Sequence, residues 1–134
     1  MKRKMRKLSL KGLRKQAWKL ESKYVRCYTA DEHGFVHCFT CDKVYHWKQM
    51  DCGHFIHKDC LDFEITNLAP QCTYCNRYQH GNLAIYAVRM VKKYGLKRVE
   101  ELQRLASIPK KFTREELEKI LDKYERKLND LQNF

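Results

Sequence analysis

Apolar side chains recur at three- and four-residue steps along much of this chain, which is the spacing of amphipathic helices. The first such segment is Leu8–Arg26, where lysines and arginines fill the opposite face. A second begins near Asn76 and ends at Gly95, a residue typical of helix C-termini. The apolar stripes of these two predicted helices are Leu10, Leu13, Ala17, Leu20 and Tyr24, and then Ala84, Ala87, Val88, Val91 and Tyr94.

Two further helices are predicted towards the C-terminus. A short one, Lys97–Ala106, ends ahead of Pro109. The last begins where Thr113 and Glu116 have the spacing of a capping box. We favour packing inside the chain as the role of this last helix, with pairing to a second chain as the alternative. Its apolar stripe consists of Leu117, Ile120, Leu121, Tyr124, Leu128 and Leu131.

The middle of the chain has short β-prone runs instead. Phe35–Thr40 and Lys43–Trp47 flank a Cys-x-x-Cys pair and predict a zinc-knuckle hairpin. Gln49–His57 is a third β-prone stretch, whereas Lys58–Asn67 has no clear periodicity and is interpreted as a loop. Helices and short strands together predict a mixed α+β protein.

Positive charge is concentrated at the start of the chain. Residues 1–26 contain eleven of the 28 lysines and arginines and one acid, Glu21, whereas the remainder is nearly balanced. A basic arm on a nearly neutral body indicates a polyanionic partner, and DNA, RNA and an anionic membrane surface all fit. The residues expected to contact DNA are Arg14, Lys15, Lys19, Lys23, Arg77 and His80.

No membrane segment or signal peptide is expected. The chain has no run of about 18 apolar residues and no apolar signal core. We therefore expect a cytoplasmic protein, in the host cytoplasm if a phage encodes it.

Four of the seven cysteines have the spacing of metal ligands. They form two pairs, Cys38-x-x-Cys41 and Cys72-x-x-Cys75, which in a chain without a signal peptide indicate a metal before a disulfide. Four thiolates suit a closed, tetrahedral and structural Zn²⁺ site that ties the chain together. The other cysteines, interpreted as small buried apolar residues, are Cys27, Cys52 and Cys60.

The segment between the cysteine pairs is rich in side chains capable of acid–base and metal chemistry. Phosphodiester hydrolysis needs an activated water and relief of charge on the phosphate. One histidine and one divalent cation held by oxygen ligands supply both, and Asp and Asn oxygens suit Mg²⁺ or Mn²⁺. The candidate residues are Asp51, His54, His57, Asp59, Asp62, Glu64, Asn67 and Asn76.

The order of these residues resembles the HNH endonucleases, which have a ββα-metal motif. A Cys-x-x-Cys pair is followed by a Gly-His pair, by Asn67 and by Cys-x-x-Cys-Asn. The segments CFTC, MDCGHF, NLAPQCTYCNRY and HGN resemble more closely the phage recombination proteins of the NinG (Rap) family. The resemblance covers roughly residues 24–95. It implies a small zinc-stapled ββα-metal (HNH) nuclease core (31–95). The charge and periodicity described above add a basic N-terminal helical arm (1–30) and a C-terminal helical extension (96–134).

The resemblance also implies individual roles. His54 matches the general base, and Asn67 matches the asparagine that orders the loop carrying the base. Asn76 matches the last motif position, a ligand of the catalytic Mg²⁺ or Mn²⁺. A glycine precedes the base where many HNH enzymes have Asp or His. Asp51, one step further along the strand, is therefore our candidate for the first metal ligand, with His57 as the alternative.

These observations support one main hypothesis and two alternatives. The main hypothesis is a metal-dependent DNA endonuclease in which His54 deprotonates the attacking water. The resemblance implies branched recombination intermediates, such as Holliday junctions and D-loops, and cutting by a homodimer. The first alternative is a non-catalytic zinc protein that binds DNA as a recombination accessory or regulatory factor, which leaves His54, Asn67 and Asn76 unexplained.

The second alternative is a nuclease that acts on RNA. Aromatic side chains stack on unpaired bases in many RNA-binding proteins, although packing in the core is their commoner use. The aromatic residues available for such stacking are Tyr24, Tyr28, Tyr45, Trp47, Tyr74 and Tyr78.

Overall fold

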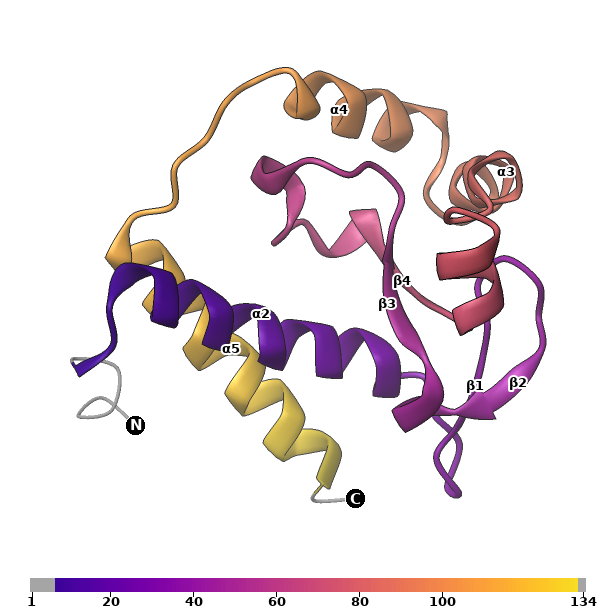
Figure 1. The fold of residues 1–134 in the computed structure, drawn as a ribbon, viewed down its shortest axis with the longest axis horizontal. Helices are drawn as coiled ribbons and strands as arrows, with labels where there is room; N and C mark the ends of the chain where they lie inside the picture. Colours follow the sequence, from indigo (N-terminus) through magenta and orange to yellow (C-terminus); the bar gives the residue numbers. More distant parts are fainter. Residues whose placement is uncertain (1–6, 133–134) are drawn as a thin grey trace. The chain divides into compact units, whose positions relative to one another are not determined.

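The chain forms two compact units in the computed structural model, which describes residues 7–132 (Figure 1). One unit combines Met1–Tyr24 with Lys110–Phe134, and the other is Val25–Pro109. Residues 1–6 of the predicted basic arm lie outside the described residues. The helices and strands are α2 (Leu10–Cys27), β1 (Phe35–His37), β2 (Val44–His46), β3 (Asp51–His54), β4 (Leu68–Gln71), α3 (Leu83–Tyr94), α4 (Leu96–Ala106) and α5 (Arg114–Gln132).

The first unit is a pair of helices, α2 and α5, that run in the same direction. Arg114, at the start of α5, donates to the Leu8 carbonyl just before α2 at 2.8 Å. Tyr24 and Tyr124, towards the ends of the two helices, have ring centroids 5.6 Å apart. The apolar stripe of α5 therefore packs inside the chain, while pairing with a second chain stays a prediction. The buried residues of this unit are Leu13, Ala17, Glu21, Leu117, Leu121, Tyr124 and Leu128.

The buried face of α2 differs from the predicted stripe. Leu10 is 51% exposed, whereas Glu21 is fully buried. The buried positions Leu13, Ala17 and Glu21 recur at four-residue steps, so an acid stands where an apolar residue was expected. The start of α5 is as predicted. The Glu116 backbone N–H donates to Thr113 Oγ1 at 3.1 Å, and the Thr113 N–H donates to Glu116 Oε1 at 3.3 Å, which completes the capping box.

The second unit contains two antiparallel two-stranded sheets. β1 pairs with β2 around the first cysteine pair, which confirms the predicted hairpin. β3 pairs with β4, with Asp51 opposite Gln71 and His54 opposite Leu68. β4 was not predicted, because its buried residues follow no alternation and include Pro70, which usually argues against a strand. The expected loop Lys58–Asn67 contains two single 3-10 turns, η2 (Asp59–Leu61) and η3 (Ile65–Asn67).

The prediction of one helix starting near Asn76 is wrong. Asn76 lies in a short π-helical turn, η4 (Tyr74–Tyr78), that directly precedes a break. His80, Gly81 and Asn82 have φ angles of 50°, 91° and 50°, a left-handed backbone that cannot continue a right-handed helix. α3 therefore starts only at Leu83, and Gly95 ends it with a φ of 87°, as its C-cap prediction requires.

The buried face of α3 also differs from the predicted stripe. Tyr86 and Met90 are buried, whereas Val88 is 54% exposed. α3 is apolar on more than one side, so periodicity alone could not select the face that the core covers. The second unit has one cluster of buried side chains around Tyr86 and another around the cysteines. The main core contains Leu61, Ala69, Tyr86, Met90, Val99 and Leu102, and the second contains Val36, Cys38, Met50, Cys72 and Cys75.

Membrane insertion was not expected from the sequence. Within residues 7–132, none of the helices combines the length and the apolar character that crossing a bilayer requires. The three-part division at residues 30 and 95 stays a prediction.

Candidate functional site

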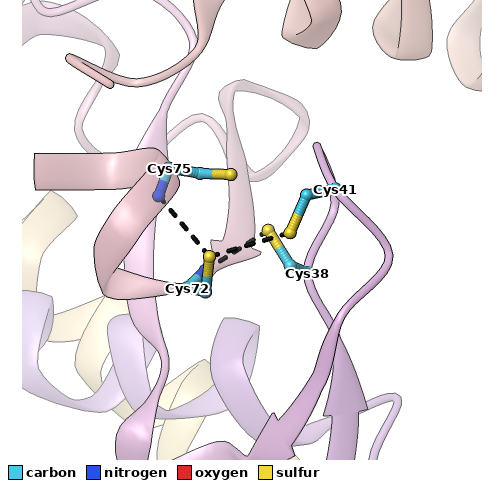
Figure 2. A group of neighbouring side chains, drawn as sticks. All are labelled: Cys38, Cys41, Cys72 and Cys75. Atoms are coloured by element: carbon cyan, nitrogen blue, oxygen red, sulfur yellow. Dashed lines mark hydrogen bonds between the residues drawn. The ribbon is translucent and has the colours of Figure 1, made fainter. Parts of the chain in front are cut away.

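The four predicted zinc ligands lie together in the second unit (Figure 2). Cys38 directly follows β1, and Cys41 lies in the same turn between β1 and β2. Cys72 directly follows β4, and Cys75 lies in η4. All four Sγ atoms lie within 4.8 Å of one another, and Cys41 Sγ is 3.8 Å from Cys72 Sγ. A tetrahedral centre with Zn–S bonds of about 2.3 Å has edges of about 3.8 Å. The cluster therefore fits one metal ion such as Zn²⁺.

Burial and hydrogen bonding act in opposite directions on these thiols. Burial disfavours the Cys38 thiolate, but hydrogen bonds from the Thr40 hydroxyl and the Cys72 backbone outweigh it and lower the pKa of Cys38 to about 7. Burial raises the pKa of Cys41 to about 12. The Cys72 N–H lies 3.3 Å from Cys38 Sγ, and the Cys75 N–H lies 3.5 Å from Cys72 Sγ. Such donors orient thiolate ligands and stabilise their charge when a metal is bound.

Asp51, at the start of β3, is hydrogen-bonded to Asn76 and Arg77, and we call these three residues the Asp51 cluster. Asn76, directly after the last cysteine, donates from Nδ2 to Asp51 Oδ2 at 3.0 Å. Arg77 donates to both oxygens of the same carboxylate, also at 3.0 Å. The structure thus brings together the two predicted ligands of the catalytic ion, 25 residues apart in sequence. Both side chains carry oxygen atoms, the donors that Mg²⁺ prefers, but Asn76 turns its amide nitrogen and not its carbonyl oxygen towards Asp51.

His54 ends β3 and lies beside a different carboxylate. Its Nε2 is 3.4 Å from Asp62 Oδ1, and its ring centroid is 5.5 Å from that of His57. We call these three residues the His54 cluster. Residues three apart in a strand point to opposite faces, which separates His54 from Asp51 along β3. Of the two candidates for the first metal ligand, Asp51 is the one placed against Asn76, and His57 lies beside His54.

Asn67 holds the backbone directly after His54. Its side chain is fully buried, accepts from the Ile56 N–H at 3.0 Å and donates to the Ile56 carbonyl at 2.9 Å. The Asn67 carbonyl also accepts from the Phe55 N–H at 2.9 Å. These contacts fix the backbone of the two residues that follow His54, while the catalytic roles of Asn67 and His54 stay predictions. Tyr86, which the sequence did not single out, extends this network by donating to the Gly53 carbonyl at 3.1 Å.

The glycine before His54 has a steric explanation. A Cβ added at Gly53 would lie 2.6 Å from Cδ of Gln71, the residue opposite Asp51 on β4. Gln71 is fully buried and donates to Thr40 Oγ1 at 3.1 Å and to the Gly81 carbonyl at 2.9 Å. It thereby joins the first hairpin to the break before α3. Gln71 carried no signal in the sequence, whereas Asp62 was one of the candidate residues between the cysteine pairs, without an assigned role.

The predicted DNA-binding residues fall into three settings. Lys15, Lys19 and Lys23 recur at four-residue steps on one side of α2, and the first two are exposed. The Arg14 guanidinium instead lies 5.2 Å above the Phe112 ring, within the same helical unit. Arg77 is paired with Asp51, and exposed His80 lies in the left-handed break before α3.

Comparisons with known proteins identify relatives over almost the whole chain. The family described as Bacteriophage Lambda NinG protein matches residues 1–133. Protein ninG of Escherichia phage 933W is 31% identical over 97% of this chain. Those of Escherichia phage lambda and Salmonella phage P22 are each 30% identical over 97% of it. The chain spans 65% of the length of the 933W protein and 64% of the other two. No solved structure matches. This chain belongs to the NinG family of bacteriophage proteins.

Proposed function

We propose that this protein is a metal-dependent HNH-type endonuclease that hydrolyses phosphodiester bonds in branched DNA recombination intermediates such as Holliday junctions and D-loops. One observation carries the proposal. Asn76, from the turn that holds the last two cysteines, is hydrogen-bonded to Asp51 on the strand that ends in His54. A candidate base and two oxygen donors thus come from one four-residue strand and the turn packed against it. The order of β3, β4 and η4 also supports the proposal, although η4 is a π-helical turn where a ββα-metal motif has an α-helix.

His54 is the general base in this proposal and accepts a proton from the attacking water. Asp62 lies beside Nε2, which favours the tautomer with its proton there and leaves Nδ1 as the basic nitrogen. Asn67 fixes the backbone after His54 through its two hydrogen bonds to Ile56. The imidazole is thereby held on a rigid segment, as proton transfer to a positioned base requires.

Asp51 and Asn76 would hold the catalytic Mg²⁺ or Mn²⁺. When bound, this ion supplies charge stabilisation at the phosphate and the leaving oxygen. Asp51 must first exchange its pair with Arg77, whose side chain is 66% exposed and remains within reach of the site. A guanidinium binds phosphate oxygens in the same two-pronged geometry as a carboxylate. Arg77 is therefore proposed to pass from Asp51 to the DNA backbone when metal and substrate bind.

The cysteine centre and the basic helix have supporting roles. Zn²⁺ at the four cysteines would tie the turn between β1 and β2 to η4, and β3 is held to this centre through its pairing with β4, which ends just before Cys72. The closed set of thiolates leaves no position for substrate. Lys15, Lys19 and Lys23 of α2 contact the phosphate backbone without sequence preference. Cutting both strands of a junction would require two copies, so we propose a homodimer on DNA.

A second candidate function is favoured by one specific observation. Both oxygens of Asp51 already accept hydrogen bonds from Arg77, and His54 lies on the opposite strand face beside Asp62. Because Asp51 and His54 already have these partners, the arrangement also suits a non-catalytic zinc protein that binds DNA. Such a protein would bind branched DNA equally well with and without Mg²⁺ and would never cut it.

An incision assay separates the two candidates. Labelled four-way junction, D-loop and matched linear duplex are incubated with zinc-loaded protein, with Mg²⁺, with Mn²⁺ or with neither ion. The divalent ion is omitted rather than chelated, because a chelator would also remove zinc from the cysteines. The proposal expects metal-dependent nicking of the branched substrates. It also expects loss of at least about 100-fold in rate for His54→Ala, the usual contribution of a general base.

A matched control is available in His33→Ala, which removes a histidine with a 74% exposed side chain outside both clusters. It should cut like wild type. Cutting by His54→Ala at the wild-type rate would refute the mechanism, and binding without any cutting would favour the second candidate. A parallel lane with single-stranded RNA tests whether RNA is the substrate instead.

A further inference from the structure

The two most exposed tyrosines of the second unit lie side by side on one short turn. Tyr74 and Tyr78, both on η4, are 57% and 71% exposed. Their ring centroids are 6.5 Å apart and their planes differ by 27°, so the rings present a stacked pair to solvent. By contrast, Tyr24 packs against Tyr124 in the helical unit. Neither the zinc centre nor the proposed catalytic residues use this pair.

The turn that carries the tyrosines is rigidly anchored. η4 starts two residues after Cys72 and contains Cys75, so the metal centre holds it. Gln79 donates from Nε2 to the Tyr74 hydroxyl at 2.8 Å, and its backbone N–H donates to the Tyr74 carbonyl at 2.9 Å. Binding of a ligand to these rings would therefore require little loss of side-chain conformational entropy, which favours binding.

A small cleft adjoins Tyr74. Its volume is about 240 Å³, and it is lined by Tyr45, Gln49, Thr73, Tyr74 and the metal-site residue Cys72. This is smaller than the roughly 300–1,000 Å³ of pockets for drug-sized ligands. An aromatic ring can stack on the face of a planar base, and an amide and hydroxyl groups can hydrogen-bond to its edge.

The charge beside the cleft suits a polyanion. Exposed Lys48 directly precedes Gln49, and its Nζ lies 5.8 Å from the Trp47 ring. The Arg26 guanidinium lies 5.5 Å from the centroid of the same Trp47 ring. The acidic residue of β3, Asp51, forms an ion pair with Arg77. Single-stranded nucleic acid is usually bound by aromatic rings combined with cations, whereas the exposed large apolar side chains of α3 are all aliphatic.

We infer that Tyr74, Tyr78 and the adjoining cleft bind an unpaired DNA base, with Lys48 contacting its backbone. Base binding needs no cleavage and so goes beyond the proposed function. Only the choice of DNA over RNA rests on that function. The site would let the protein distinguish DNA containing unpaired nucleotides from continuous duplex, because bases inside a duplex cannot reach the rings.

The test is a binding titration without Mg²⁺ or Mn²⁺, so that no cleavage occurs. Zinc-loaded protein is added to labelled oligothymidylate of roughly twelve nucleotides, within the usual range of site sizes. The same-length oligouridylate and a linear duplex are run beside it. Tyr74→Ala and Tyr78→Ala should each weaken oligothymidylate binding by about tenfold and leave duplex binding unchanged. Tyr78→Phe, which keeps the ring, should bind like wild type.

Two controls keep the result specific. Val88→Ala removes an exposed apolar side chain of α3 and should not change binding. The salt dependence should stay constant in the tyrosine variants, because stacking releases no counterions. A single 2-aminopurine in the oligonucleotide should lose fluorescence on binding to wild type, a readout of stacking that needs no variant.

Three results would overturn the inference. They are unchanged binding by both alanine variants, equal weakening for duplex and single strand, or tighter Tyr-dependent binding to oligouridylate than to oligothymidylate. The titration contains no Mg²⁺ or Mn²⁺ and measures binding alone. Failure of the base site is therefore distinguishable from failure of the endonuclease proposal, which the incision assay measures separately.

Discussion

Replacing Asn67 by alanine tests whether this residue orders the backbone after His54. The substitution removes two hydrogen bonds, to the Ile56 N–H at 3.0 Å and to the Ile56 carbonyl at 2.9 Å. Each unsatisfied group left behind costs about 1–3 kcal/mol when buried. Ile56 is only half-buried, so water can partly replace the lost partners. We therefore expect Asn67→Ala to lower the free energy of unfolding by about 2–4 kcal/mol.

Amide hydrogen exchange gives the local readout, at a fixed saturating zinc concentration because bound metal shifts apparent stability. The Ile56 amide should lose at least about tenfold in protection, since about 1.4 kcal/mol corresponds to a factor of ten. The Phe55 amide, whose acceptor is the Asn67 backbone carbonyl, should lose less. Asn129→Ala, at an exposed position of α5, is the matched control and should stay within about 0.5 kcal/mol of wild type.

Asn67→Asp sharpens the same test through its pH dependence. The introduced carboxyl keeps an acceptor for the Ile56 N–H but places a second oxygen against the Ile56 carbonyl. Burial and this repulsion raise its folded pKa above the unfolded value, so this variant loses stability as pH rises through the folded pKa. Wild-type protection at Ile56 in Asn67→Ala, together with unchanged stability, would refute the reasoning.

Three further predictions follow from the described contacts. Gly53→Ala should destabilise the chain by about 1–3 kcal/mol in urea unfolding, because its Cβ would meet the buried Gln71 side chain; unchanged stability would contradict this close contact. Cys72→Ser should abolish stoichiometric zinc binding, measured by elemental analysis, and unfold the second unit by circular dichroism; a folded, metal-free variant would show that the centre is dispensable. The Lys110 ammonium and the Thr113 backbone hold the pKa of Glu116 below its usual value, so its stabilisation of α5 is present above pH 4.5 and lost as pH falls through the folded pKa. Glu116→Gln should flatten that part of the pH–stability curve, and an unaltered curve would exclude this role.

Features fixed by local spacing were predictable from this sequence. Two Cys-x-x-Cys turns each present two sulfurs to one side, and the structure brings all four within 4.8 Å. Capping residues and periodicity located α5, because Thr113 and Glu116 satisfy the helix end without help from the rest of the fold. The Gly95 C-cap was predictable for the same reason, since only a local φ is involved.

Features that depend on distant partners were not predictable. β4 forms despite Pro70 because β3 supplies its ladder. The buried faces of α2 and α3 were set by what covers them, which placed Glu21 inside and Val88 outside. Gly53 looked like a departure from the HNH pattern, but the buried Gln71 side chain leaves no room for a Cβ there.

The sequence by itself determined the metal ligands, most helix positions and the residues of the candidate site, because those signals lie within a few neighbouring positions. Only the tertiary structure decided how the site residues are grouped. It placed Asp51 against Asn76 and Arg77, and His54 beside Asp62. The physical reason is that these pairs join residues 8 to 26 positions apart, and the pairing of β3 with β4 and the packing of η4 against β3 bring them together.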